Sequence, residues 1–530
     1  MPFEHSTSQS SGIAEPDSRL DALWWKRIHT SIGARFGLWL AAILMVSHLY
    51  ALVVFGATYW VDCIIYTSLG SCLTDPEALR GFYGFKGMLN HAHVGMGTPG
   101  LWRLLCTLPE TWRWPVMALF QHGLAAGALF YAFSSINQIW PSRLHLCTCA
   151  LLCSLPFYQS FHNALLTESL SSSFLLIGLT VCIRLGFGKK AFGFREFAVL
   201  LVSLFLVTQV RSYCGLTLFA TGLIALFVRR GAVPRSSWIS LIAAVIVAWL
   251  FFPCYRCALT GKFFMPSIGT TRLVFALWAN PRPSPETVKY IGTFPFPPEY
   301  PVETFLGNTK IDYNETSEIG QFWMEHGLSY AEVNKRVGQI SNRLLFDRFQ
   351  VTLTRLRCAL DSSGFCMLAF SSNRKEEIYQ FKSAFKERSA QMGLYRYLSW
   401  ITGTSTGERM PNFFQTPRLS IPFYEKGQQQ LLDFLTPYLS PLPTWFRDPL
   451  GLGLVWPDVW AVLGLLSALG IFLREKFLSC ILLLPLLVNA AVTFQAPIAG
   501  SRYCYVLVPI YLLSASIAGA MLRAKVRRSC

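Results

Sequence analysis

Long apolar segments recur along this chain and constrain its fold more than any other feature. A helix that crosses a bilayer needs about 20 mostly apolar residues. Of the 530 residues, 52% are hydrophobic and only 14% are charged. The pattern predicts an all-α polytopic membrane protein with about ten transmembrane helices, at 36–57, 114–134, 143–160, 169–187, 196–210, 213–228, 237–254, 452–473, 477–495 and 503–523.

Basic residues in the short connections indicate the orientation of these helices. Short loops rich in Lys and Arg stay in the cytoplasm. The formal charge of +17 is therefore a signal of orientation, and nucleic acid is not an expected partner because no soluble basic domain would bind it. Both ends of the chain are expected in the cytoplasm, on the same side as the basic clusters at 25–27, 189–190, 229–230, 474–476 and 523–528.

Two segments on the other side are longer than connectors. The first, 58–113, joins the first two helices, and the second, 255–451, is long enough to need structure of its own. The predicted organisation is a cytoplasmic tail at 1–35, seven transmembrane helices and the first outer loop within 36–254, an extracytoplasmic loop region at 255–451, three more helices within 452–523, and a cytoplasmic tail at 524–530.

The clearest element of the long loop is an amphipathic helix. Ser329 and Glu332 have the spacing of a capping box. Apolar residues follow at helical spacing, namely Val333, Val337, Ile340, Leu344 and Leu345. We expect a helix from 329 to about 357 that lies against the outer face of the membrane domain.

Four ionisable residues fall at the outer ends of predicted helices. They are Asp62, Glu168, Arg211 and Arg502. Ionisable groups near membrane depth are costly, so each is a candidate for function. Each could also be an ordinary interfacial charge or a structural ion pair. Their arrival at one face from distant parts of the sequence predicts a shared charged pocket.

Such a pocket suits chemistry on a phosphorylated lipid. Arginines bind phosphate through two parallel charge-assisted hydrogen bonds. A carboxylate such as Asp62 takes a proton from an incoming hydroxyl as a general base. The sequence contains no P-loop, no G-x-G-x-x-G, no H-E-x-x-H and no G-x-S-x-G that would indicate a nucleotide, zinc or serine-hydrolase site.

Histidine and cysteine patterns are weak. His91 and His93 are spaced like metal ligands but lack a visible third ligand, so no metal site and no cofactor are predicted, and a divalent cation stays open. Buried Gln121 and His122 are expected to be satisfied core polar groups. Two pairs in the outer segments could form disulfides, Cys63 with Cys72 and Cys358 with Cys366.

Five short motifs follow one another along the chain: Asp62 with Tyr66, Thr98-Pro99-Gly100-Leu101-Trp102, Leu166-Thr167-Glu168-Ser169-Leu170, Gln209-Val210-Arg211, and Arg502-Tyr503 with Pro509. In this order they resemble the C-type glycosyltransferases (GT-C superfamily), in particular the bacterial branch related to protein mannosyltransferases and lipid A aminoarabinose transferase. The sequence departs from the family pattern in two places. Asp62 has no acidic neighbour, and Ser212 stands where a proline usually follows the arginine.

The resemblance implies an enzyme that transfers a sugar from a polyprenyl-phosphate donor to a lipid, glycan or protein acceptor at the outer face of the membrane. It implies a bacterial inner membrane or, alternatively, an endoplasmic reticulum membrane. It makes Asp62 the catalytic base and assigns substrate binding to Tyr66, Glu168, Arg211, Arg502 and Tyr503.

Three other functions remain open from the sequence. An O-antigen ligase or polymerase-like enzyme also combines many spans with one large outer loop, and would place key His or Arg residues in that loop. A lipid or solute transporter would place charges near the bilayer midplane. A membrane scaffold without catalysis would need no charges at the rim.

The predicted topology can be tested with two reporters. A reporter fused after Cys530 should lie in the cytoplasm, and one inserted beside Asn314 should lie on the opposite side, because short basic connections stay inside. Protease protection or a compartment-specific fluorescent tag measures both positions. Two reporters on the same side would contradict the shared outer pocket.

Overall fold

The computed structural model describes helices joined by short links. The described residues are 35–49, 51–52, 63–83, 94–154, 158–159, 161–163, 165–188, 193–261, 263, 269–298, 301–307, 313–365, 449–496 and 501–529. Within these ranges the regular structure is helical throughout, with no strand. The expected all-α class is therefore confirmed for this part of the chain.

Five stretches are long and apolar enough to cross a membrane, which supports a helical membrane protein. They are α6 (Glu110–Ile139), α9 (Thr167–Phe187), α12 (Arg235–Thr260), α24 (Lys476–Gln495), and Cys504–Ala524. The last begins in the 3₁₀ helix η2 (Ser501–Val506) and continues into α25 (Val508–Ser529). Shorter apolar helices lie at four of the remaining predicted spans: Arg35–Leu49, α7 (Leu144–Cys153), α11 (Ser212–Val228) and Val459–Phe472 within α23 (Pro449–Phe472). Helix α10 (Phe194–Val210) covers the span predicted at 196–210. That the chain crosses the membrane ten times stays a prediction.

Helix α9 is the centre of the bundle. It packs against α6, α10 and α11, and nearly all of its residues are buried. Several of its buried hydroxyls bond carbonyls of the same helix: Ser171 donates to the carbonyl of Thr167 at 2.6 Å and Thr180 to that of Leu176 at 2.7 Å. Small residues allow close helix approach, as at Gly178, where an added Cβ would meet the side chain of Leu218. The serine-rich sequence thus suits a helix that is surrounded on all sides.

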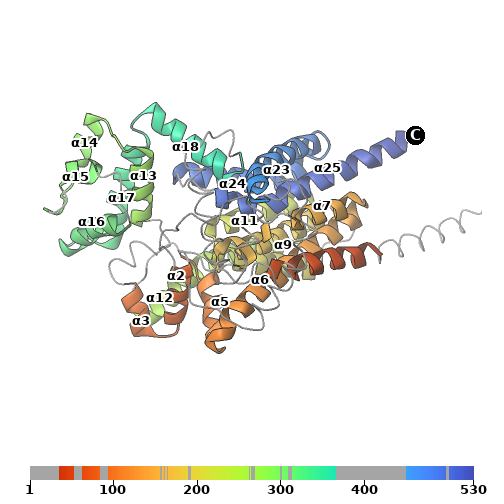
Figure 1. The fold of residues 1–530 in the computed structure, drawn as a ribbon, viewed down its shortest axis with the longest axis horizontal. Helices are drawn as coiled ribbons and strands as arrows, with labels where there is room; N and C mark the ends of the chain where they lie inside the picture. Colours follow the sequence, from red (N-terminus) through yellow and green to blue (C-terminus); the bar gives the residue numbers. More distant parts are fainter. Residues whose placement is uncertain are drawn as a thin grey trace, which may run out of the picture.

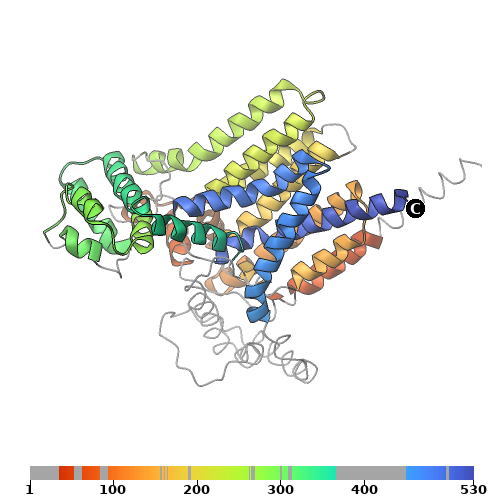
Figure 2. The same ribbon diagram turned by 90° about the horizontal axis from the view of Figure 1, so that it is seen from above.

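A separate lobe projects from one end of the bundle (Figure 1). Its own apolar core includes Leu273, Phe305, Trp323, Val337 and Leu344. The described C-terminal end lies at the opposite end of the bundle in both views (Figures 1 and 2). The lobe comprises α13 (Gly269–Ala279), α14 (Pro285–Ile291), α15 (Val302–Gly307), α16 (Tyr313–Glu325) and α17 (Tyr330–Leu345), and α18 (Phe349–Ser362) leads back to the bundle.

The amphipathic helix forms as predicted but ends earlier and packs elsewhere. Ser329 caps α17, and Glu332 completes the capping box. The helix ends at Leu345 rather than near 357, because the chain turns before α18 begins at Phe349. Its apolar face is buried inside the lobe, mainly against α13 and α16. The expectation that this face lies on the membrane domain was wrong, since the lobe has a core of its own to fill.

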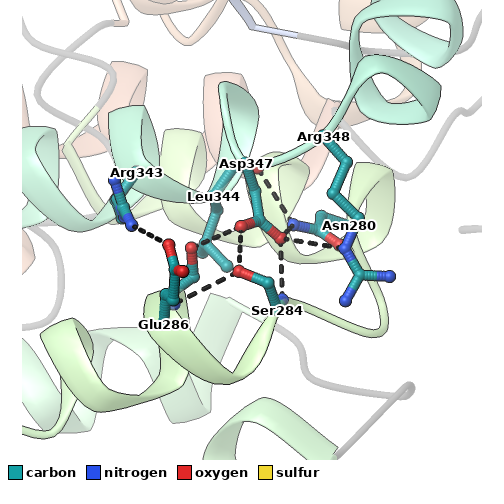
Figure 3. A network of polar contacts seen from close by, with 8 residues as sticks. Asn280, Ser284, Glu286, Arg343, Leu344, Asp347 and Arg348 are labelled. Atoms are coloured by element: carbon teal, nitrogen blue, oxygen red, sulfur yellow. Dashed lines mark hydrogen bonds and ion pairs between the residues drawn. The ribbon is translucent and has the colours of Figure 1, made fainter.

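The turn between α17 and α18 is held by the Asp347 carboxylate (Figure 3). It accepts hydrogen bonds from the Ser284 backbone N–H at 2.8 Å and from Asn280 Nδ2 at 3.0 Å, and also from the hydroxyls of Ser284 and Thr287. Burial alone would raise the pKa of Asp347, but these hydrogen bonds outweigh it and lower the pKa from 3.8 to about 2. One side chain therefore joins the ends of α13 and α17 to the start of α14.

Helix α18 ties the lobe to the bundle. Arg355 donates from Nε to the carbonyl of Phe494 at 2.8 Å, and its guanidinium carbon lies 4.0 Å from the Phe494 ring centre. Seven residues further on, the Ser362 carbonyl accepts a hydrogen bond from Asn489 at 2.8 Å. The two contacts run antiparallel along α24, so α18 descends into the bundle (Figure 2). Its buried end reaches α25, where Tyr511 donates to the Ser363 carbonyl at 2.6 Å.

The proposed Cys63–Cys72 disulfide is wrong. The two cysteines stand at opposite ends of α2 (Cys63–Cys72). Nine residue steps along a helix span about 13 Å, whereas bridged Cα atoms lie about 4.4–6.8 Å apart. Cys63 instead donates its thiol to the carbonyl of Leu165 at 3.4 Å. Of the other pair, Cys366 lies outside the described residues.

Replacing Asp347 should loosen the lobe in a pH-dependent way. The folded pKa is depressed, so the carboxylate stabilises the fold above about pH 4 and loses that effect as pH falls towards 2. Asp347→Ala should cost about 2–3 kcal/mol at neutral pH. Thermal unfolding of purified protein at pH 7 and near pH 2.5 measures the difference from wild type, which should shrink at the lower pH.

Glu325→Gln is the matched control for that experiment. Glu325 is exposed and accepts a hydrogen bond from its helix neighbour Gln321 at 2.8 Å, so its loss should cost little. Equal effects of the Asp347 and Glu325 variants, or an Asp347 effect that does not change with pH, would contradict the role assigned to the Asp347 network.

Candidate functional site

The predicted site residues Glu168 and Arg211 form a buried ion pair. Arg211 Nη2 lies 2.6 Å from Glu168 Oε1, and the two side chains are 9% and 2% exposed. Two further N–H groups of the guanidinium are hydrogen-bonded: Nε donates to Thr167 Oγ1 at 2.8 Å and Nη1 to Tyr213 Oη at 2.7 Å. The arginine fork is therefore held in one orientation by three partners.

Local backbone structure places both charges. Arg211 is the single residue between α10 and α11, with an extended backbone (φ −145°, ψ 108°) that ends one helix and begins the next. Glu168 lies in the first turn of α9, where the helix dipole favours a negative charge. Burying a charge is costly unless it is paired and hydrogen-bonded. Glu168 meets both conditions through Arg211 and the Thr167 hydroxyl, 3.3 Å from its second oxygen.

Segments from distant parts of the chain meet around this pair. Cys63, at the start of α2, contacts the carbonyl of Leu165, just before α9. A Cβ at Gly95 would fall 2.0 Å from the Gln209 carbonyl oxygen, so the residues that lead into α5 (Gly97–Leu105) press on the end of α10. Helix η2 packs against both α9 and α18. The site therefore lies at the lobe end of the bundle.

The structure describes some of the other predicted site residues but not all of them. Tyr66 is half-buried on α2, between the main core and a smaller apolar cluster around Leu69. Arg502 and Tyr503 belong to η2, which brings their backbone to α9, and their side chains are not described. Asp62 lies outside the described residues. The pairing of Glu168 with Arg211 is thus the part of the predicted pocket that the structure contains.

A cluster of buried histidines lies beside this pair and was not predicted. His48 and His122 face each other with their Nδ1 atoms 3.0 Å apart. His162, in η1 (Phe161–Asn163), contacts Ser169 Oγ through Nδ1 at 2.8 Å and Tyr505 Oη through Nε2 at 3.0 Å. Ser169 directly follows Glu168 in the first turn of α9. The histidines and the ion pair therefore form neighbouring parts of one polar region.

A signal for this cluster was present in the sequence. His48 and His122 both fall inside predicted spans, where ionisable groups are uncommon and face the bundle interior. The expectation for His122 alone, a satisfied core polar group, is confirmed because both of its ring nitrogens are hydrogen-bonded. His162 reaches the cluster because the chain turns in η1, just before α9, and the sequence did not indicate this turn.

The described His, Cys, Asp and Glu side chains contain no group of three arranged to hold a metal ion. His91 and His93 lie outside the described residues. Comparison of the chain with protein-family models, with curated proteins and with solved structures finds no match in any of the three. Function must therefore be argued from the site itself.

The ion pair should show strong energetic coupling. Removing one partner leaves the other charge buried and unpaired, which typically costs about 3–5 kcal/mol. Glu168→Gln and Arg211→Met should each lower the unfolding temperature of the purified protein, and the double variant should lose less than the sum of the two. A double-mutant cycle measures this, and strictly additive losses would show that the two side chains are independent.

Proposed function

We propose that this chain is a membrane glycosyltransferase that moves a sugar from a polyprenyl-phosphate donor to a hydroxyl acceptor at the lobe end of the bundle. The observation that carries the proposal is that segments within or next to the motifs lie close to the Glu168–Arg211 pair. Cys63 contacts the Leu165 carbonyl, Gly95 lies against Gln209 at the end of α10, and η2 packs against α9. Their order is that of the motifs that resemble the GT-C superfamily.

The chemistry of the pair suits a phosphorylated lipid. Glu168, Thr167 and Tyr213 orient the Arg211 guanidinium before any ligand arrives. A preorganised arginine loses less entropy when it binds phosphate than a mobile one does. Arg502 is proposed as the second phosphate ligand, while Tyr66 and Tyr503 contact the donor or the acceptor.

The proposed reaction needs one carboxylate, which acts as the general base. The acceptor oxygen attacks the anomeric carbon of the donor sugar, and the bond from that carbon to the phosphate oxygen breaks. The acceptor proton passes to Asp62, and the polyprenyl phosphate leaves with the electron pair of the broken bond. When the polyprenyl phosphate leaves, its contacts with Arg211 and Arg502 would be the first to change.

Asp62→Asn tests this assignment. The substitution preserves size but abolishes proton acceptance, so turnover should fall about a hundred- to ten-thousand-fold. Donor binding should survive, because the phosphate is assigned to Arg211 and Arg502. The measurement is sugar release from a polyprenyl-phosphate sugar by purified wild-type and variant protein in equal amounts.

Asp75→Asn is the matched control for the Asp62 experiment. Asp75 lies in the same outer segment and caps α3 (Pro76–Phe82) by accepting from the N–H groups of Glu77 and Ala78. Asparagine is an equally good cap, so this variant should fold and turn over normally. Normal turnover by Asp62→Asn would move the base elsewhere, with Glu168 next.

A proton-coupled transporter is the second candidate. The observation that favours it is the buried histidine cluster, because ionisable groups inside a bundle mark proton pathways in pumps and transporters. Reconstituted protein distinguishes the two functions: a transporter moves lipid or solute across vesicles without cleaving the donor. The O-antigen ligase alternative has less support, since His326 of the lobe is exposed and bonds the Phe322 carbonyl at 2.8 Å.

A further inference from the structure

Helix α18 carries exposed apolar side chains on the face turned away from α24. Phe349, Leu353 and Leu356 are 73%, 37% and 47% exposed. They are spaced four and three residues apart, so they form one stripe along the helix. The opposite face, which includes Val351 and Arg355, is buried. An exposed apolar stripe of this kind marks a surface that contacts a partner or a membrane.

The contact between α18 and α24 places this stripe at the edge of the bilayer. Helix α24 has 20 residues, and a helix of that length is about 30 Å long, which matches the hydrocarbon thickness of a membrane. When α24 crosses the membrane, its lobe end therefore marks the boundary of the hydrocarbon. Arg355 bonds the carbonyl of Phe494 at that end. Each helical residue rises about 1.5 Å, so Leu353 and Leu356 lie within about 3 Å of this boundary and Phe349 about 9 Å further out.

Past this boundary α18 continues into the bundle (Figure 2). Its last residue, Ser362, is bonded through its carbonyl to Asn489 of α24, and the next carbonyl, that of Ser363, to Tyr511 of α25. Leu487, two residues from Asn489 on α24, is exposed as well. Exposed apolar side chains thus occur on both helices at neighbouring levels, as expected where lipid covers both.

The arginines of α18 also suit the edge of a bilayer. Arg355 is buried against α24, whereas Arg357 is exposed and follows Leu353 by one helical turn. A long arginine side chain can lay its stem along apolar surface and keep its guanidinium among the headgroups, where it attracts anionic lipids. Arg348, just before the helix, is half-exposed and lies 3.7 Å from Asp347. Arg357 is therefore the better candidate for a contact with a headgroup.

We propose that α18 is an interfacial helix whose exposed stripe binds phospholipid of the surrounding bilayer. Acyl chains contact Leu353 and Leu356, and Phe349 lies at the level of the headgroups. Arg357 binds the phosphate of an anionic headgroup. The lobe is then attached to the bilayer surface as well as to the bundle.

A photo-crosslinker placed on the stripe tests this contact. The amino acid p-benzoyl-phenylalanine replaces Leu353, or Phe349 in a second variant, and the full chain is reconstituted in vesicles of phosphatidylcholine and phosphatidylglycerol in equal amounts. After irradiation, mass spectrometry of the digested protein should find phospholipid attached at both positions. Tyr290 is the matched control, because it is as exposed as Leu353 but belongs to α14, at the end of the lobe away from the bundle (Figure 1). The crosslinker at Tyr290 should capture no lipid.

Three outcomes of this experiment would overturn the proposal. A crosslink from Leu353 or Phe349 to another part of the same chain, or a covalent dimer, would show that protein covers the stripe. Lipid capture at Tyr290 equal to that at Leu353 would show that the capture is unspecific. The absence of a lipid adduct at both stripe positions would show that α18 does not reach the bilayer.

The headgroup contact is tested in the same vesicles. With the crosslinker at Leu353, Arg357→Gln should lower the ratio of phosphatidylglycerol adducts to phosphatidylcholine adducts about fivefold. Arg343→Gln is the matched control, because Arg343 is half-exposed but lies 3.8 Å from Glu286 within the lobe, so its loss should leave the ratio unchanged. An unchanged ratio in Arg357→Gln would overturn the role given to Arg357. None of these readouts depends on sugar turnover, so the lipid surface and the proposed function can fail separately.

Discussion

The ion pair between Glu168 and Arg211 is the interaction on which the arrangement of the site depends. It joins the first turn of the central helix α9 to the one-residue link between α10 and α11. Neither charge would be stable alone in a bundle that is largely apolar. Once paired, they hold the start of α9 against the end of α10 and the start of α11, and the surrounding segments pack around this point. A site that is rigid before ligand arrives suits both phosphate binding and catalysis.

Polar groups inside this bundle are satisfied in two ways. Some hydroxyls along α9, such as those of Ser171 and Thr180, bond the carbonyl four residues earlier and so require nothing from neighbouring helices. Charged and aromatic polar groups cannot do this and bond between elements instead, as Arg211, His122 and Tyr505 do. The second kind is concentrated near the start of α9. A helix start offers unpaired N–H groups and a positive dipole, which favour a carboxylate there.

The lobe has an apolar core of its own and is also attached to the bundle. Its core is closed by its own helices, and Asp347 holds the turn that connects α17 to α18. One of its attachments is α18, where Arg355 bonds the backbone at the end of α24 and Asn489 bonds the end of α18. Because α18 also contacts η2, the element that carries Arg502 and Tyr503, the lobe is mechanically linked to the proposed site.

The sequence by itself determined the helical class, the positions of the five long apolar helices and the capped start of α17, because these depend on local composition and periodicity. It also identified Glu168 and Arg211 as candidates, since charges at membrane depth are conspicuous. Only the tertiary structure decided that these two bond each other, that the apolar face of α17 fills a lobe, and that Cys63 and Cys72 lie too far apart to bridge. The histidine cluster is the clearest case, because His48, His122 and His162 come from three elements. Contacts between residues far apart in sequence follow from how helices pack, and no local pattern encodes that packing.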